Sequence, residues 1–337
     1  QGDRFIGYSE KIKNEIELES SIVKPLLKGE DVKKYATLIN NYYCLYPHHE
    51  IDGKTIPLEE EVFKNKYPLA YNYIFPFREE LIKKKIRYKT NPKAWYSLHR
   101  SREISLFEQK KIITPEISLG TNMTIDVNNF YHNTKCYTLT KRSDIKENYK
   151  FWLAILNSKL LWYFLSSTGY VLRGGFFTFK TKYLEPFPLP KLDNINQQTP
   201  FVKKVEIILN DSQNLQDISN KFIKYLTNQY KLEKFTKKLE NWHELEFGEF
   251  IKELNKAIKV TNREMAKDTA KGLNIDYVAL PSLTKKDEFE WLELFEENKK
   301  KAQELQQQIT QTEKEIDAMV YKLYGLTPEE IEIVENS

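Results

Sequence analysis

The stretch FEENKKKAQELQQQITQTEKEIDAMVYKL (residues 295–323) decides the architecture of the C-terminal part of the chain. Its mostly apolar seam positions recur in steps of three, four or seven residues, at Phe295, Ala302, Leu305, Ile309, Thr312, Ile316, Met319 and Leu323. Such spacing is the heptad seam of a helix that packs lengthwise against another helix. Thr312 is the polar position in this seam. The stretch therefore predicts one long helix with a helical partner.

A suitable partner precedes it in the sequence. Residues 201–230 carry apolar side chains on one face of a helix, at Phe201, Val205, Ile208, Leu215, Ile218, Phe222 and Leu226. We expect the two long helices to pack antiparallel, with residues 242–266 as a further helix or pair of helices against them. A short last helix is predicted as well, because Gly325 is suited to end a helix and Thr327-Pro328 to begin one.

Residues 1–190 have a different texture, rich in Tyr, Phe, Pro and β-branched side chains. Three prolines between residues 186 and 190 and a polar stretch at 193–199 separate them from the helical part. Residue patterns predict strands at 42–46, 111–118, 122–126 and 135–140, and helices at 59–70, 71–85 and 150–166. The expected fold class is α+β: a small mixed β-sheet domain over 1–190, then a long-helix, antiparallel coiled-coil-like region over 200–337.

Positive charge concentrates in the middle of the chain. The whole sequence has a formal net charge of +4, whereas residues 81–190 hold 19 Lys and Arg against 7 Asp and Glu. Local positive charge supplies most of the affinity of a protein for nucleic-acid phosphates. The block predicts a polyanion-binding surface, and chance clustering in a lysine-rich chain is the alternative.

The two cysteines, Cys44 and Cys136, provide no disulfide framework. Their small number indicates a reducing compartment, so we expect a cytoplasmic protein. Cys44 lies near His48 and His49, but a structural zinc site takes four ligands at close spacing. Buried thiols are therefore the favoured interpretation, and no metal site is expected.

No membrane partner is expected either. The first residues are polar and show no secretory signal. The most apolar stretch, residues 151–167, is interrupted by polar side chains and is short for a membrane span, so it predicts a buried helix. Because the chain begins with Gln1, we expect it to be a fragment of a longer protein.

Motifs for catalysis are incomplete. An Asn-Pro pair at residues 91–92 begins like the clamp of an amino-methyltransferase but continues with Lys-Ala, and there is no Gly-x-Gly after a strand, no P-loop, no Gly-x-Ser-x-Gly and no His-Glu-x-x-His. Asp287 with Glu297 and Lys299 has the spacing of a magnesium nuclease, but Glu/Lys-rich helical sequence produces such matches by chance. We therefore expect binding and no catalytic residue in this chain.

A run of basic residues opens the basic block. It contains Lys83, Lys84, Lys85, Arg87 and Lys89. Such a run is either a solvated helix end or a surface that contacts phosphates. On the second interpretation, Lys83, Lys84, Lys85 and Arg87, together with Lys110 and Lys111, position the DNA backbone.

Two further segments are suited to reading bases. In WYSLHRSR (residues 95–102), Arg100 and Arg102 are two apart and point the same way if the backbone is extended. Arginine pairs bidentately with guanine edges or phosphates, and salt bridges to Glu103 or Glu108 are the alternative.

The second of these segments spans residues 168–182 and contains Arg173-Gly174-Gly175, followed by Lys180 and Lys182. Glycines allow a backbone to approach a ligand closely, and the basic side chains place charge around that approach. The alternative is an ordinary loop that leads into a strand with its phenylalanines in the core.

Seven landmarks, in this order, resemble a known family: VKPLLKGEDVKKY (23–35), WYSLHR (95–100), KIITPEIS (111–118), TKCY (134–137), LAILNSK (153–159), RGG (173–175) and FPLP (187–190). The family is the TaqI-like C-terminal specificity domain of adenine-specific DNA methyltransferases and fused type II restriction–modification enzymes. The resemblance covers residues 20–190. Each motif is weak alone, and the ordered set is specific.

The resemblance implies a module that recognises a sequence in double-stranded DNA for an adenine-N6 methyltransferase in cis or in trans. It implies S-adenosylmethionine, and Mg²⁺ if a nuclease is present, as cofactors of the parent enzyme and none in this segment. Two other hypotheses remain open: a coiled-coil scaffold for protein partners, and a stand-alone nuclease built on Asp287, Glu297 and Lys299.

Overall fold

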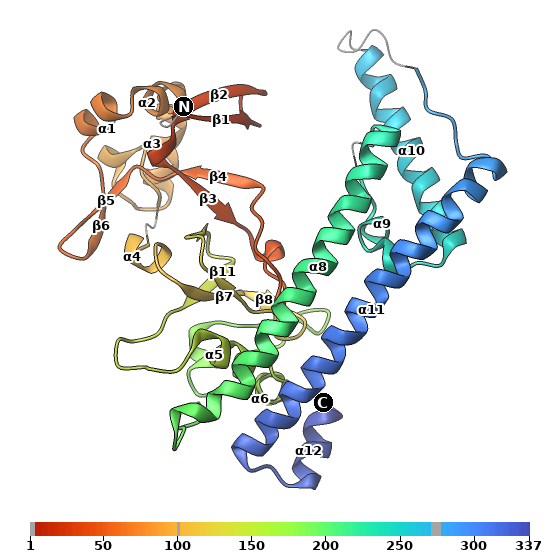
Figure 1. Ribbon diagram of the computed structural model, residues 1–337. Coiled ribbons are helices and arrows are strands. Elements are labelled where there is room, and N and C mark those ends of the chain that lie inside the picture. The colour runs from red at the N-terminus through yellow and green to blue at the C-terminus, as the bar shows by residue number, and fades with distance from the viewer. Residues whose placement is uncertain (1–3, 100–101, 233, 271–277) are drawn as a thin grey trace. The chain divides into compact units, whose positions relative to one another are not determined.

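The structure, a computed structural model, describes residues 4–99, 102–232, 234–270 and 278–337 (Figure 1). The chain divides into two compact units: residues 1–34, 38–198 and 327–337 form the first, and residues 35–37 and 199–326 the second. Short strands and helices build the first unit and long helices the second, which confirms the α+β class. Separate folding of domains 1–190 and 200–337 stays a prediction.

The strands of the first unit pair into small sheets of two or three strands. Every pairing between these strands is antiparallel except that of β10 with β3, which is parallel. The strands within the described residues are β1 (Arg4–Ser9), β2 (Asn14–Glu19), β3 (Val23–Leu27), β4 (Tyr42–Leu45), β5 (His48–Ile51), β6 (Lys54–Pro57), β7 (Lys111–Pro115), β8 (Ile117–Ser118), β9 (Thr124–Asp126), β10 (Tyr131–His132), β11 (Cys136–Leu139) and β12 (Phe177–Thr178). The predicted strands correspond to β4, β7 with β8, β9 and β11.

Prolines divide the helical segment between residues 59 and 87 more often than its periodicity suggests. The structure has α1 (Glu60–Lys66), α2 (Pro68–Ile74) and α3 (Arg78–Arg87) where the sequence predicts two helices. Pro68 begins α2, and a 3₁₀ turn at Phe75–Phe77 precedes α3. Proline cannot donate the backbone hydrogen bond that a helix interior needs, so each one marks a helix start.

The apolar stretch after residue 149 is also two helices, α5 (Tyr149–Leu156) and α6 (Lys159–Thr168), where one was expected. Asn157 causes the break. Its buried side chain donates to the carbonyl of Met123 (2.9 Å) and accepts from the amide of Met123 (3.0 Å), while Ser158 caps α6. The pair of bonds ties both helices to the start of β9. Among the described residues, no helix is both long and apolar enough to cross a membrane.

Three long helices form the second unit: α8 (Thr199–Tyr230), α10 (Phe247–Ala270) and α11 (Lys285–Tyr324), with the short α9 (Lys237–Glu240). Lys204 near the start of α8 pairs with Glu315 near the end of α11. Trp291 near the start of α11 donates its indole N–H to the hydroxyl of Tyr230 at the end of α8 (2.7 Å). The two helices are therefore antiparallel, as predicted.

The heptad seam faces the interior of this unit. Phe295, Ala302, Ile309, Thr312 and Ile316 are buried, and Leu305, Met319 and Leu323 are half-buried. Thr312 satisfies its hydroxyl by donating to the carbonyl of Gln308 (2.8 Å), four residues earlier on α11. The polar position in the seam thus leaves no unsatisfied group.

The predicted C-terminal stop and restart are confirmed. Gly325 ends α11 in the left-handed conformation (φ 71°). Thr327 then caps α12 (Pro328–Glu335) through a capping box with Glu330. This last helix belongs to the first unit, where it packs on α6 and an ion pair joins Lys159 to Glu335.

Candidate nucleic-acid interface

Helix α3 carries the first basic run, in a position that the helix dipole stabilises. Glu79 and Glu80 lie in its first turn, and Lys84, Lys85 and Arg87 in its last, which matches the helix dipole. Lys83, Lys84 and Arg87 are exposed. Lys84 pairs with Glu80 (2.7 Å), which also binds Lys11 (3.0 Å), and these two lysines lower the pKa of Glu80 to about 2. Lys84 is thus partly neutralised by Glu80, whereas Lys83 and Arg87 extend from the same exposed side of the helix end.

Lys85 of the same run points inward. Its side chain is 2% exposed, and its Nζ donates to Ser97 Oγ (2.7 Å) and to the carbonyl of Leu98 (3.0 Å). Burial lowers the pKa of Lys85. The ammonium group is therefore buried and holds the WYSLHR segment against α3.

The WYSLHR segment contributes to the core as well as to the surface. Trp95 is 1% exposed and donates its indole N–H to Glu60 Oε1 (3.0 Å). The hydroxyl of Tyr96 donates to the carbonyl of Leu58 (2.5 Å). These aromatic side chains fix the start of the loop that leads to Arg100 and Arg102.

Of the two arginines in that loop, the structure describes only Arg102. Arg100 lies outside the described residues. Arg102 is half-buried, and its backbone is clamped by Tyr46, whose hydroxyl donates to the carbonyl of Arg102 (2.6 Å) and accepts from its amide (3.1 Å). The structure therefore fixes the backbone from which Arg102 extends.

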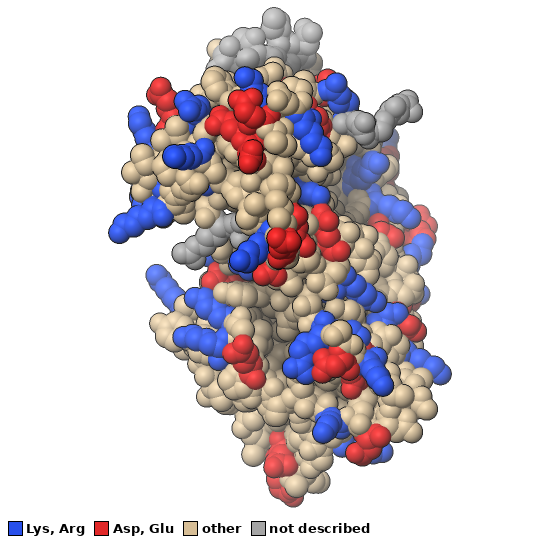
Figure 2. Space-filling model, turned by 90° about the vertical axis from the view of Figure 1, so that its left-hand side faces the viewer, with Lys and Arg blue, Asp and Glu red and all other residues tan. Residues whose placement is uncertain are grey.

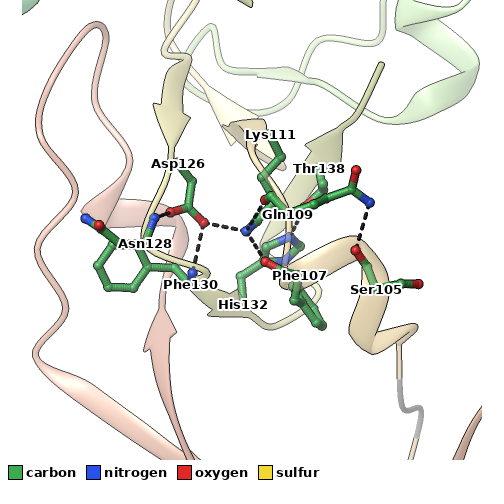
Figure 3. A network of polar contacts seen from close by, with 9 residues as sticks. All are labelled: Ser105, Phe107, Gln109, Lys111, Asp126, Asn128, Phe130, His132 and Thr138. Carbon is green, nitrogen blue, oxygen red and sulfur yellow. Dashed lines mark hydrogen bonds and ion pairs between the residues drawn. The ribbon is translucent and has the colours of Figure 1, made fainter. Parts of the chain in front are cut away.

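Lys111 lies in the interior, at the centre of a polar network (Figure 3). Neither its side chain nor that of Asp126 is exposed, and Nζ of Lys111 lies 2.5 Å from Oδ2 of Asp126. The same Nζ donates to the carbonyl of Phe107 (2.5 Å). Asp126 also accepts the amides of Asn128 (2.7 Å) and Phe130 (2.9 Å). Lys111, like Lys85, is therefore buried in the fold and does not present its ammonium group at the surface.

Its neighbour Lys110 is exposed and lies among other cations. The Nζ atoms of Lys110 and Lys141 lie 5.6 Å and 5.1 Å from the centre of the Tyr149 ring. Partial burial, followed by the charges of Lys150 and Lys141, lowers the pKa of Lys110. Three lysines that are far apart in sequence therefore gather about one tyrosine. The sequence signal for Lys141 and Lys150 was only their place in the basic block.

Arg173, Gly174 and Gly175 form the tip of a tight hairpin. The amide of Gly175 donates to the carbonyl of Leu172 (3.2 Å), and the amide of Leu172 to the carbonyl of Phe176 (2.6 Å). Gly174 and Gly175 have φ values of 86° and 78°, a region that favours glycine. Arg173 is exposed at this tip. The turn thus presents one arginine on a backbone that a ligand can approach closely.

The hairpin is held to β8 through β12, and charge gathers at that junction. Phe177 and Thr178 pair with Ser118 and Ile117. Just before β8, Glu116 binds Lys135 (3.2 Å), with Lys180 at 3.7 Å. Lys182 on α7 (Thr181–Leu184) is exposed, with its Nζ 4.5 Å from the ring centre of Tyr183. Lys135, which the sequence reading missed, thus joins Lys180 at this edge.

A close backbone approach connects two of the sequence landmarks. A Cβ placed on Gly29 would lie 2.9 Å from the carbonyl oxygen of Lys135, so only glycine fits without a shift. The VKPLLKGEDVKKY and TKCY segments therefore meet at this point.

Figure 2 shows that lysines and arginines are interspersed with acidic side chains on the face in view, so the basic side chains there do not form one continuous patch.

The two metal hypotheses find no support in the geometry. Ten residues of helix α11 separate Asp287 from Glu297, about 15 Å along the axis. Asp287 caps that helix with Thr284, and Lys299 is buried against Glu246 (2.9 Å). Burial raises the pKa of Cys44 to about 12. Among the residues that the structure describes, no three His, Cys, Asp or Glu are placed to hold a metal ion.

Comparisons with known proteins show which families and proteins this chain is similar to. The family model of the TaqI-like C-terminal specificity domain matches residues 24–189, and that of a domain of unknown function matches residues 194–320. The chain is 25% identical over 192 residues to the Type II restriction enzyme and methyltransferase RM.Eco57I of Escherichia coli, a match that covers 53% of this chain and 19% of that protein. It is 24% identical over 177 residues to the Type II methyltransferase M.BstVI of Geobacillus stearothermophilus, covering 52% of this chain and 29% of that protein. The chain therefore spans less than a third of either relative.

Proposed function

We propose, from the premise that residues 24–189 are a TaqI-like C-terminal specificity domain, that this chain recognises a DNA sequence for a restriction–modification enzyme. The observation that carries the proposal is the hairpin tip at Arg173. An exposed arginine on a glycine turn, followed along the chain by the exposed Lys180 and Lys182, has the form of a groove-reading element with phosphate contacts around it.

The proposed contacts divide by chemistry. Arg100, Arg102 and Arg173 are the proposed readers of base edges in the major groove, because arginine forms bidentate pairs with guanine. Gly174 and Gly175 allow the backbone to approach the DNA. The remaining proposed contacts neutralise phosphates, namely Lys83, Lys84, Arg87, Lys110, Lys180 and Lys182.

The partner of the module is a methyltransferase, in cis or in trans, that modifies adenine at N6. S-adenosylmethionine is the proposed methyl donor of that enzyme, and Mg²⁺ is required if it also cleaves DNA. Such an enzyme works in the cytoplasm, on the DNA of its own cell. Within this scheme the long helices of residues 200–337 serve as a spacer that holds the reading domain at a set distance from the catalytic domain.

A coiled-coil scaffold for other proteins is the rival function. The structure weakens its main support, because the heptad seam of α11 is buried within the second unit. Ala302 is fully buried and Ile316 is 1% exposed. A partner helix would have to displace the packing that already covers the seam.

Selection from a pool of random duplex DNA tests the proposal. Retained duplexes are sequenced, and a short enriched motif is expected. The control is the folded Arg173→Glu/Lys180→Glu variant, which should retain no motif. Enrichment that is the same with this variant would contradict the assigned readers. Absence of any retention by the folded wild-type chain would favour the scaffold.

A further inference from the structure

A pocket with a volume of about 690 Å³ lies in the first unit, apart from the Arg173 hairpin. Its walls are the end of β11 with the loop that follows, the inner side of α5, and the segment from Leu189 to Ile195. This volume falls within the range of small-molecule sites, about 300–1,000 Å³. Nothing in the proposed DNA contacts uses the interior of this pocket.

The loop that forms one wall is fixed by its own hydrogen bonds. The Nζ of Lys141 donates to the carbonyls of Glu147 (2.5 Å) and Ile145 (3.4 Å), so that it closes the loop on itself. The amide of Lys141 donates to the hydroxyl of Tyr149 (3.1 Å), which joins the loop to α5. The wall therefore exists before any ligand binds, and little ordering entropy opposes binding.

The lining combines an aromatic floor with a cationic rim. Trp152 and Tyr149 are half-buried and line the pocket together with apolar side chains, among them Ile112 and Leu139. Lys141, Arg142, Lys146 and Lys191 also line it, against the acidic Asp144 and Glu147. Arg142 holds Asp144 through two bonds, of 3.1 Å and 2.9 Å, so that carboxylate is already neutralised.

Two lysines of the rim, Lys146 and Lys191, are exposed, and the Nζ atoms of Lys110 and Lys141 lie near the ring of Tyr149. Burial, followed by the charges of Lys150 and Lys141, lowers the pKa of Lys110. An anion at the rim would offset the positive charge that gathers there. A flat aromatic group beside it would stack on the floor, at about 1–3 kcal/mol for a base on an aromatic side chain.

We propose that the pocket binds one nucleotide unit, with its base against Trp152 and Tyr149 and its phosphate at the rim lysines Lys146 and Lys191. The shared chemistry has two sources: a free mononucleotide, or a nucleotide that leaves the stack of bound DNA. The proposal goes beyond sequence recognition, because the hairpin reads duplex DNA without this pocket.

The test labels the full chain with 5-fluorotryptophan and follows its five tryptophans by ¹⁹F NMR. The Trp152→Phe variant assigns the signal of Trp152. The probes are the four deoxynucleoside 5′-monophosphates, the matching nucleosides, inorganic phosphate, a paired duplex, and the same duplex with one unpaired nucleotide. Saturable shifts of the Trp152 signal are expected with monophosphates or with the unpaired nucleotide. Which of the two acts identifies the source.

Variants separate the roles of base and phosphate. Lys146→Gln should weaken binding of the effective probe about fivefold, the effect of losing one exposed charge contact of about 1 kcal/mol. Lys54→Gln, at an exposed lysine of the β5–β6 hairpin, is the matched control and should change nothing.

Two results would overturn the proposal. One is that no probe shifts the Trp152 signal of the folded chain. The other is that inorganic phosphate alone saturates it as tightly as a monophosphate does, because the base would then play no part. Binding of paired duplex is measured in parallel, so failure of the pocket is distinguished from failure of DNA recognition.

Discussion

Nζ of Lys111 and Oδ2 of Asp126 lie 2.5 Å apart, and neither side chain is exposed to solvent. The pair joins β7 to β9 at a point where the two strands are antiparallel partners, since Lys111 lies opposite Asp126 in the register. Asp126 also accepts two backbone amides of the turn that follows, from Asn128 and Phe130. One buried ion pair thus fixes both a strand register and a turn.

Loss of the lysine should destabilise this sheet strongly. Lys111→Met leaves the buried carboxylate of Asp126 without its counter-charge, and breaking a buried pair in this way costs about 3–5 kcal/mol. Urea unfolding at pH 7.5 measures the change in the free energy of unfolding.

The double variant Lys111→Met/Asp126→Asn is its control. It removes the charge while an amide oxygen still accepts from the turn, so the loss should be smaller than for Lys111→Met alone. If the double variant loses as much free energy of unfolding as Lys111→Met and Asp126→Asn lose together when measured singly, the ion pair is not what holds the strands.

Stability should fall as the pH is lowered from 6.5 to 4. Burial lowers the pKa of His48 to about 4, with Lys85 and His49 adding to the effect, and burial likewise lowers the pKa of His132 to about 4. Because the unfolded histidines take up protons near pH 6.5, the stability is fully present above that pH. It is lost progressively down to pH 4, with about 2 kcal/mol gone for each histidine at pH 5.

The histidine origin of this loss is checked by substitution. His48 has no hydrogen-bond partner for either ring nitrogen, so His48→Leu removes a titrating group without breaking a side-chain bond. Free energies of unfolding at pH 7.5 and pH 5 should differ by less in His48→Leu than in the wild type. An equal difference in both proteins would show that His48 does not contribute to the acid sensitivity.

Charge reversal at the hairpin should abolish DNA binding without unfolding the chain. Arg173 and Lys180 are exposed, so Arg173→Glu/Lys180→Glu leaves the core intact. Two lost phosphate or base contacts should also lower the slope of log affinity against log salt by up to about 2. Lys54→Glu/Lys64→Glu makes the same change in net charge at exposed lysines of the first unit. Binding that falls equally in both variants would show that total charge matters and the hairpin does not.

Substitution of a glycine in the turn should destabilise it. Gly174 has a φ of 86°, so Gly174→Ala introduces backbone strain of about 1–2 kcal/mol and should weaken DNA binding by displacing Arg173. Gly248→Ala is the matched control, since Gly248 lies in α10 and a Cβ added there would meet nothing within 4 Å, and it should stabilise the helix by about 0.5–1 kcal/mol. Thermal unfolding and duplex binding are measured for both. Unchanged stability and affinity of Gly174→Ala would mean that the turn tolerates a side chain.

Much of the fold could be predicted from local pattern. The spacing of Phe295, Ala302 and Ile309 specified a long helix, and Gly325 with Thr327 specified its end, because helix periodicity and capping are properties of a few neighbouring residues. The break at Asn157 escaped prediction. Its reason is a backbone partner, Met123, that lies 34 residues away in the sequence.

The candidate site also has features that the sequence predicts and features that only the tertiary structure decides. The sequence by itself determined where positive charge concentrates, that Arg173 is followed by two glycines, and the ordered landmarks of the family, since all of these are written in adjacent residues. Only the tertiary structure decided which basic residues face solvent. Lys110 and Lys111 are neighbours in sequence, yet one is exposed beside Tyr149 and the other is buried against Asp126. Lys111 begins β7, a strand in which every residue is buried, whereas Lys110 precedes that strand. Asp126 and Tyr149 come from distant segments of the chain, and only the tertiary structure brings one of them to each lysine.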